Sequence, residues 1–356
     1  MRLSPVASPE KVIAVAFCEA PRSLHRSLLY IDSALPLTEK ALIKRIRQQA
    51  GMGRARHILA GIGDDCAVLR LPPSHEALIT TDFSLEGIHF RRDWHPPEVV
   101  GHRCLTRGLS DIAAMGGEPI AAFLSLALPR KFRQSWVDRF LRGLLQLAND
   151  FGVTLAGGDT AKSRNGILAD IVVLGSVPKS KAILRSGARP GDHVYVSGQL
   201  GGSAATIELL LHSPKKKLHP TAFSRHFYPI PRIKLGRILR EQRFASSMID
   251  LSDGLSTDLA HICDESGVGA EIRSEAIPRA NMGKPLREVE LRFALHGGED
   301  YELLFTAPRT RRVPDTISGV LITLIGEITK RKRIILIDEN GIGRELLPEG
   351  WEHFRV

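Results

Sequence analysis

The sequence has no apolar run long enough to cross a membrane and little that would stack on nucleic-acid bases. Its longest apolar stretches, such as Ile120–Leu128, fall far short of the ~18 residues that a spanning helix needs. The net charge is +10, of which residues 1–58 carry +6, but only 6% of the 356 residues are aromatic. None of these interleaves with the basic runs Lys215–Lys217 and Lys330–Arg333. We therefore expect a cytoplasmic protein that binds neither membranes nor nucleic acid.

Cysteine is scarce and scattered. The four cysteines form no C-x-x-C pair and have no histidine at zinc-ligand spacing: Cys18, Cys66, Cys104 and Cys263. A chain of this length with 43% apolar residues can bury a large core without disulfides or a structural metal. The pattern favours reduced thiols, as in cytoplasmic proteins.

Hydrophobic patterning predicts strands and helices that alternate irregularly along the chain. Strands are predicted at Ala77–Thr81, Ala121–Leu128, Ala169–Val177, His193–Ser197, Ser247–Asp250, Leu303–Thr306, Leu321–Ile325 and Ile334–Ile337. Helices are predicted at Pro97–Met115, Ser135–Phe151, Gly202–Leu211, Arg232–Arg240 and Ser256–Ser266. The mixture is too irregular for a doubly wound parallel sheet, so the expected fold class is α+β with two layers in each domain.

A stretch rich in Lys, Ser, Gly and Pro, near Pro178–Pro190, predicts a boundary between two domains. The expected domains are residues 37–180 and 181–356. Residues 1–36 have no clear periodicity, and we expect a poorly ordered N-terminal extension there. From Leu37 the pattern becomes helical, with Thr38 as the capping residue.

Acidic residues stand beside glycine or at the end of an apolar strand in six separate places. These are Asp64-Asp65 after Gly61-Ile-Gly63, Asp82 after Leu78-Ile-Thr-Thr81, Asp111 in Leu109-Ser-Asp-Ile-Ala-Ala-Met-Gly116, Asp159 after Gly157-Gly158, the pair Asp250 and Asp253, and Glu299-Asp300 after Gly297-Gly298. A single Asp-Gly pair is usually only a turn or a helix cap. Six such places favour convergence, and converging carboxylates need a counter-charge. Because no His or Cys joins the series, the expected cation is Mg²⁺ or Mn²⁺.

Magnesium held by a few carboxylates usually keeps waters and takes up substrate phosphates, so the acids predict phosphate chemistry. The sequence has no G-x-x-x-x-G-K-[ST] motif and no protein-kinase catalytic loop. The segment Gly198-Gln-Leu-Gly201-Gly202-Ser203 joins a predicted strand to a predicted helix. Its amides could hold a phosphate, or it could be an ordinary β–α turn.

Eight segments, taken in order, resemble the thiamine-monophosphate kinases of the aminoimidazole-ribonucleotide-synthetase (PurM-like) superfamily. They are Gly61-Ile-Gly-Asp-Asp-Cys-Ala67, Thr80-Thr-Asp-Phe-Ser-Leu-Glu-Gly-Ile-His-Phe90, Leu109-Ser-Asp-Ile-Ala-Ala-Met-Gly116, Gly157-Gly-Asp-Thr160, Arg185-Ser-Gly-Ala188, Ile249-Asp-Leu-Ser-Asp-Gly-Leu255, Gly297-Gly-Glu-Asp-Tyr-Glu-Leu303 and Gly350-Trp-Glu-His-Phe354. Together they cover the chain from about residue 37 to its end, and the set is specific where each segment alone is not.

The resemblance implies a two-domain PurM-like α+β architecture, a homodimer that pairs N-terminal sheets, and a nucleotide site between the domains. It implies transfer of the γ-phosphoryl group of ATP to thiamine monophosphate, assisted by several Mg²⁺ ions. The implied Mg²⁺ ligands are Asp65, Thr80, Thr81, Asp82, Asp111, Asp159, Asp250 and Asp253. The implied ATP contacts are Gly158, Asp159, Arg185 and Ser252. The implied contacts of thiamine monophosphate are His89, Glu299 and Trp351.

Other functions remain open at this point. Aminoimidazole ribonucleotide synthetase, selenophosphate synthetase and the hydrogenase maturation factor belong to the same superfamily, although Glu86-Gly-Ile-His-Phe90 and Gly298-Glu-Asp-Tyr-Glu302 favour the thiamine enzyme. A regulator that binds Mg²⁺-nucleotide without turnover, and a phosphohydrolase or nuclease, are alternatives from other classes. For the kinase we expect direct in-line transfer without a general base, because a phosphate acceptor with a second pKa of ~6 is already a nucleophile at pH 7.

Overall fold

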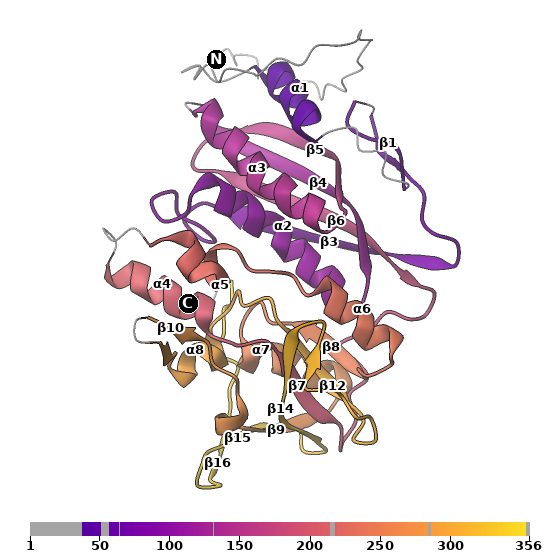
Figure 1. The fold of residues 1–356 in the computed structure, drawn as a ribbon, viewed down its shortest axis with the longest axis vertical. Coiled ribbons are helices and arrows are strands. Elements are labelled where there is room, and N and C mark those ends of the chain that lie inside the picture. The colour runs from indigo at the N-terminus through magenta and orange to yellow at the C-terminus, as the bar shows by residue number, and fades with distance from the viewer. Residues whose placement is uncertain are drawn as a thin grey trace, which may run out of the picture.

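The computed structural model describes residues 38–50, 57–63, 65–130, 132–213, 218–283 and 286–353. The expected extension at residues 1–36 and Cys18 lie outside this part of the chain. The described residues form two α+β domains, stacked one above the other in Figure 1. The first described helix, α1 (Glu39–Ala50), begins after Thr38, whose hydroxyl accepts a hydrogen bond from the amide of Ala41 as the sequence predicts.

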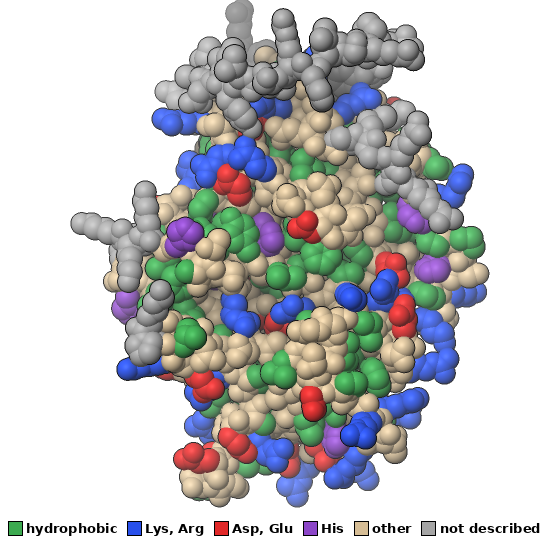
Figure 2. Space-filling model, viewed as in Figure 1, with side chains coloured by type: hydrophobic (Ala, Val, Ile, Leu, Met, Phe, Trp, Pro, Cys, Tyr) green, Lys and Arg blue, Asp and Glu red, His purple; other side chains and the backbone are tan. Residues whose placement is uncertain are grey.

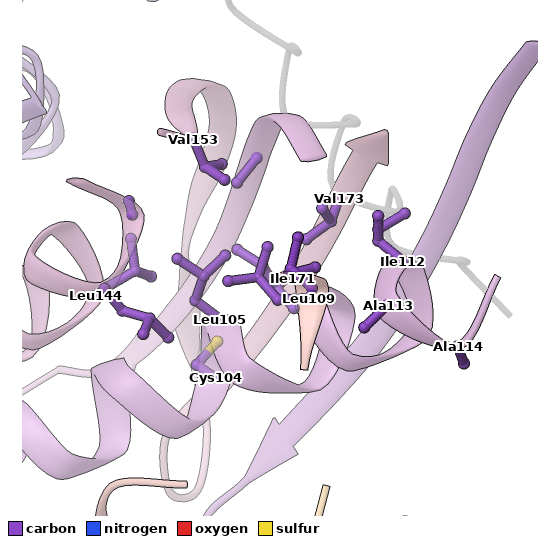
Figure 3. Close-up of a cluster of buried hydrophobic side chains, with 14 of the residues drawn as sticks. Cys104, Leu105, Leu109, Ile112, Ala113, Ala114, Leu144, Val153, Ile171 and Val173 are labelled. Atoms are coloured by element: carbon purple, nitrogen blue, oxygen red, sulfur yellow. The ribbon is translucent and has the colours of Figure 1, made fainter. Parts of the chain in front are cut away.

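The N-terminal domain is built on a four-stranded sheet whose one face is covered by helices and whose other face is covered in part by the β1–β2 hairpin. The strand order is β3 (His75–Leu85), β6 (Leu168–Pro178), β4 (Glu118–Pro129) and β5 (Thr154–Ser163). Strands β4 and β5 are parallel, and the other neighbours are antiparallel. The helices α2 (Pro97–Ala114) and α3 (Gln134–Asp150) bury apolar side chains against one face of this sheet. Figure 3 shows Leu105 and Leu109 of α2 beside Ile171 and Val173 of β6.

The C-terminal domain is built on a larger sheet. Its main strand order is β16 (Gly343–Glu345), β15 (Ile334–Ile337), β9 (Gly269–Arg273), β14 (Val320–Thr329), β7 (His193–Ser197), β12 (Leu303–Ala307) and β8 (Ser247–Asp250), with β13 (Thr316–Ile317) paired to β14. The helices of this domain are α4 (Gly202–His212), α5 (Ser224–Phe227), α6 (Ile233–Glu241), α7 (Leu255–Ser266) and α8 (Leu291–His296). The short hairpins β1 (Ile58–Ala60) with β2 (Val68–Leu69), and β10 (Asn281–Met282) with β11 (Arg287–Glu288), lie outside both sheets.

Helix α2 lies where the two domains meet. Alternate residues of β12 point to opposite faces of their strand. Leu303 and Phe305 therefore join the core that contains α2, whereas Leu304 joins a second core with α7. Helix α6 also packs against α2. As a result, the C-terminal end of α2 lies beside β3 of one sheet and β8 of the other.

The structure confirms the expected α+β class and most of the predicted elements. Strands β7, β8 and β15 have the predicted bounds, and the other predicted elements differ by a few residues at their ends. Hydrophobic patterning does not predict β5, because the adjacent Gly157 and Gly158 are unfavourable in a strand interior. The predicted domain boundary stays a prediction.

No helix in the described part of the chain is long and apolar enough to cross a membrane. The described cysteines, Cys66, Cys104 and Cys263, form no disulfide. On the face shown in Figure 2, hydrophobic side chains lie between scattered basic and acidic ones over both halves of the molecule.

Candidate active site

Three acidic residues from three different elements meet at the C-terminal end of α2. Asp82 comes from β3, Asp111 from the last turn of α2, and Asp250 from the end of β8. The hydroxyl of Thr80 donates a hydrogen bond to Asp111, and Ser110 Oγ donates to Asp250 Oδ2 at 2.6 Å. Strand β3 alternates, so Thr80 and Asp82 lie on its α2-facing side. The cluster therefore joins the two domains.

The carboxyl groups of this cluster resist ionisation. Burial, followed by the charge of Asp111, raises the pKa of Asp82 to about 7. Burial and then Asp111 raise the pKa of Asp250 to about 8, and burial also raises the pKa of Asp111. Their shared surroundings therefore disfavour the ionisation of all three carboxyl groups at once. A set of half-buried and buried oxygen-only donors in mutual repulsion fits a hard divalent cation.

Asp253 and Arg185 border this cluster. Burial raises the pKa of Asp253, which lies in the turn between β8 and α7. Its backbone carbonyl accepts a hydrogen bond from the amide of Trp351 at 3.0 Å. The exposed Arg185 lowers the pKa values of Asp111, Asp250 and Asp253, so its positive charge faces the acidic cluster.

The structure places three of the implied metal ligands differently from Asp82, Asp111 and Asp250. Thr81 lies on the face of the sheet opposite α2, where its hydroxyl donates to Asp170 Oδ1 at 2.8 Å. Asp159 is exposed on β5, and its side chain accepts from the amide of Thr160 at 2.8 Å. Asp65 is exposed between β1 and β2. None of these three side chains is buried with the acidic cluster.

Gly158 and Ser252 occupy sites where the backbone is the important group. Gly158 has φ +144°, and a Cβ there would lie 1.9 Å from the carbonyl oxygen of Leu124. Only glycine fits beside the backbone of β4 at this position, and Gly158 itself is exposed. Ser252 precedes Asp253, and its carbonyl accepts a hydrogen bond from the amide of Glu299 at 2.8 Å.

The loop Gly198–Ser203 is an ordinary turn and not a phosphate site. Asp300 Oδ2 accepts a hydrogen bond from the amide of Gly201 at 2.6 Å, and Asp300 Oδ1 accepts from the amide of Ser203 at 3.4 Å. A carboxylate of the protein thus occupies the amides that a phosphate would use. Of the two alternatives left open by the sequence, the structure supports the turn.

A second group of side chains surrounds Glu299. Its carboxylate forms ion pairs of 2.6 Å with Arg103 and with Arg107, both on α2. Burial alone would raise the pKa of Glu299, but the two guanidinium groups outweigh it and hold the pKa at about 2. Glu299 is therefore a permanent anion at neutral pH.

The aromatic residues expected near the substrate lie close to one another. His89 Nδ1 accepts a hydrogen bond from the amide of Leu85 at 3.0 Å, so the ring proton is on Nε2. Burial, then the charge of Arg107, lowers the pKa of His89 to about 4, which keeps the ring neutral. The ring of His353 lies 5.5 Å from that of His89 and 5.6 Å from that of Trp351, which is 52% exposed.

Sequence reasoning missed Arg103, Arg107, Ser110 and His353. The first two could have been found, because Arg103, Arg107 and Asp111 are spaced by four residues within a predicted helix and so share one face. Ser110 and His353 lie inside quoted motifs, but only the tertiary structure shows what they contact.

Comparison with known proteins first defines the class. Residues 63–177 match the family model of the AIR synthase related protein, N-terminal domain. Residues 189–339 match the family model of the AIR synthase related protein, C-terminal domain. Escherichia coli HypE, a hydrogenase maturation protein, shares this fold with a TM-score of 0.68 at 19% identity, over 86% of this chain and 96% of that one. At this identity the likeness concerns the fold alone.

Within that class, the relatives are more specific. Thiamine-monophosphate kinase of Escherichia coli strain K12 is 39% identical over 303 residues, which are 83% of this chain and 91% of that protein. The solved structure of AaThiL complexed with AMPPCP and TMP has a TM-score of 0.71 at 35% identity, over 80% of this chain and 89% of that one. The chain belongs to the thiamine-monophosphate kinase family of AIR synthase-related proteins, and it is an ATP-dependent phosphotransferase.

Proposed function

We propose that this protein converts thiamine monophosphate and ATP to thiamine diphosphate and ADP by direct, Mg²⁺-assisted transfer of the γ-phosphoryl group. The observation that carries the proposal is the cluster of Asp82, Asp111 and Asp250, which unites the two domains and resists ionisation. Two polyanionic substrates can approach one another only where positive charge offsets their repulsion.

The acidic cluster would hold that charge. The oxygen donors are the buried Asp250 and the half-buried Asp82, Asp111 and Thr80, and Asp253 lies at the border of this cluster. When bound, Mg²⁺ supplies the positive charge that neutralises and aligns the phosphates. Asp65, Thr81 and Asp159 stay predicted ligands, and their side chains lie apart from this cluster.

Nucleotide and thiamine monophosphate would bind on different sides of this cluster. The exposed Gly158, together with Asp159, Arg185 and Ser252, would contact ATP. The permanent anion Glu299, the neutral His89 and the exposed Trp351 would contact the thiamine part of the acceptor. The acceptor phosphate is itself a nucleophile at neutral pH, so no side chain need remove a proton, and no phosphoenzyme is required.

We also propose that the enzyme acts as a homodimer in the cytoplasm. Strand β3 is an edge strand. On the face of its sheet opposite α2 it exposes Ile79 and Phe83, which are 71% and 55% accessible. Exposed apolar side chains on a long edge strand favour pairing with a second copy. The absence of disulfides among the described cysteines supports a reducing compartment.

The test is product analysis after incubation with ATP, MgCl₂ and thiamine monophosphate, with controls that omit Mg²⁺ or thiamine monophosphate. Equimolar, Mg²⁺-dependent ADP and thiamine diphosphate are expected. ADP without thiamine diphosphate would reject the acceptor. Neither product, from folded protein that binds ATP, would indicate a nucleotide-binding regulator. The variants Asp82→Asn and Asp253→Asn should each turn over at least ~10²-fold more slowly, and near-wild-type rates for both would contradict the metal assignment.

A further inference from the structure

Two arginines of α2 reach across the domain interface to one carboxylate. Arg103 Nη2 and Arg107 Nη2 each lie 2.6 Å from a different oxygen of Glu299. The side chains of Arg103, Arg107 and Glu299 are only 4%, 13% and 18% accessible. Arg103 also donates to the backbone carbonyl of His226. Arg107 makes no such second contact to the backbone among the described residues, so Glu299 is the group that holds its guanidinium.

One guanidinium would be enough to neutralise Glu299, and the site contains two. A buried ion pair gains little net stability, because the desolvation of its charges offsets their attraction. The second arginine therefore calls for an explanation other than stability. Arg107 Nη2 donates to Glu299 Oε1 at 2.6 Å, and its charge helps to hold the pKa of Glu299 at about 2.

The loop that carries Glu299 adopts a backbone conformation that its residues do not favour. Glu299 has φ +65° and Tyr301 has φ +52°, both in the left-handed region. The amides of Glu299 and Tyr301 donate to the carbonyls of Ser252 and Leu251, at 2.8 and 2.9 Å. The hydroxyl of Tyr301 is buried and has no hydrogen-bond partner in the described structure. Strain and an unsatisfied polar group at one loop are typical of a functional site.

We propose that Arg107 is a positioning residue for the acceptor site: together with Arg103 it fixes the Glu299 carboxylate in one orientation toward the thiamine part of thiamine monophosphate. The inference rests on the proposed function, because Glu299 is assigned to the acceptor there. Arg107 acts through Glu299 and through the loop around it. Removing Arg107 leaves Arg103 bound to a carboxylate that can rotate, so acceptor binding weakens and ATP binding does not.

The variants Arg107→Met and Arg107→Lys test this inference by steady-state kinetics with each substrate varied in turn. Loss of a charge-assisted hydrogen bond corresponds to about a tenfold or larger effect. We expect Arg107→Met to raise KM for thiamine monophosphate by ~10-fold or more and to leave KM for ATP within about twofold. Arg107→Lys, which keeps the charge but not the planar fork, should recover part of this loss.

A matched control comes from α3, which packs against α2. Arg139 forms a two-point ion pair with Glu98 of α2, at 2.7 and 2.8 Å, on the exposed surface. Arg139→Met removes an arginine–glutamate pair without touching the site, and both KM values should stay within about twofold of wild type. If Arg107→Met leaves both KM values unchanged, or raises both equally, the role is only structural and the inference is wrong.

A measurement without turnover separates this inference from the proposed function. Amide hydrogen exchange at Glu299 and Tyr301 should be faster in Arg107→Met than in wild type and in Arg139→Met, because the carboxylate that anchors the loop is less constrained. If wild type makes no thiamine diphosphate, the proposed function fails, and exchange alone then decides whether Arg107 orders the loop. Unchanged exchange at both amides would overturn the inference whatever the kinetics.

Discussion

Replacing Asp250 by Asn should stabilise the protein when no divalent cation is present. Asp250 is only 3% accessible, and burial with the charge of Asp111 raises its pKa to about 8 from an ordinary 3.8. The folded state therefore keeps a proton that the unfolded state has lost, and stability falls as pH rises from about 4 to about 8. At pH 7 the raised pKa of Asp250 lowers the free energy of unfolding by at most about 4 kcal/mol. Asn carries no charge, and its carbonyl can still accept from Ser110.

The assay is urea unfolding at pH 7 with and without Mg²⁺, followed by turnover measurements. Without Mg²⁺, Asp250→Asn should be more stable than wild type by up to ~4 kcal/mol, and the difference should shrink toward pH 4. Wild type should gain ~2–3 kcal/mol when Mg²⁺ is about 100-fold above its dissociation constant, and the variant should gain much less. Turnover of the variant should fall by at least ~10²-fold.

Asp138 provides the control, because it is also 3% accessible but forms an ion pair with Arg45. Asp138→Asn breaks a pair and leaves a charge without its partner, so it should destabilise the protein to the same extent with and without Mg²⁺. If Asp250→Asn is folded but less stable than wild type at pH 7 without Mg²⁺, repulsion within the acidic cluster does not set the charge state of Asp250. A folded but less stable Asp250→Asn would thus show that the buried carboxyl group does not destabilise the wild type.

Tyr301→Phe removes a buried hydroxyl that has no partner, so urea unfolding should show unchanged or slightly higher stability; a loss above about 1 kcal/mol would reveal a hidden hydrogen bond. Burial lowers the pKa of His95 to about 4 from 6.5, so protonation of the unfolded state should remove up to ~3 kcal/mol of stability as pH falls through this range. The raised pKa of Asp250 increases stability as pH falls through the same range, so the His95 effect is measured as the difference in stability between wild type and His95→Gln. A difference that does not change with pH would contradict the prediction. Light scattering should give the mass of a dimer for wild type and the mass of a monomer for the double variant Ile79→Glu, Phe83→Glu. A double variant with the same mass as a dimeric wild type would exclude this face as the interface.

The sequence alone determined the elements and the chemistry of the acids. Hydrophobic periodicity is local, so it predicted strands such as β7, β8 and β15 with their bounds. It could not predict β5, where pairing with β4 outweighs the poor strand preference of Gly157 and Gly158. Oxygen donors without His or Cys already indicated a hard cation, because ligand type is a property of the residues themselves.

Only the tertiary structure decided which acids share an environment. Asp82, Asp111 and Asp250 lie far apart in the sequence and meet because α2 is placed between two sheets. Burial there shifts their pKa values, whereas Asp159 stays exposed on β5. The amides of the Gly198–Ser203 loop bind Asp300, and Glu299 lies between two arginines of the other domain. Charge state and contact depend on distance and dielectric surroundings, and these exist only once distant segments have packed together.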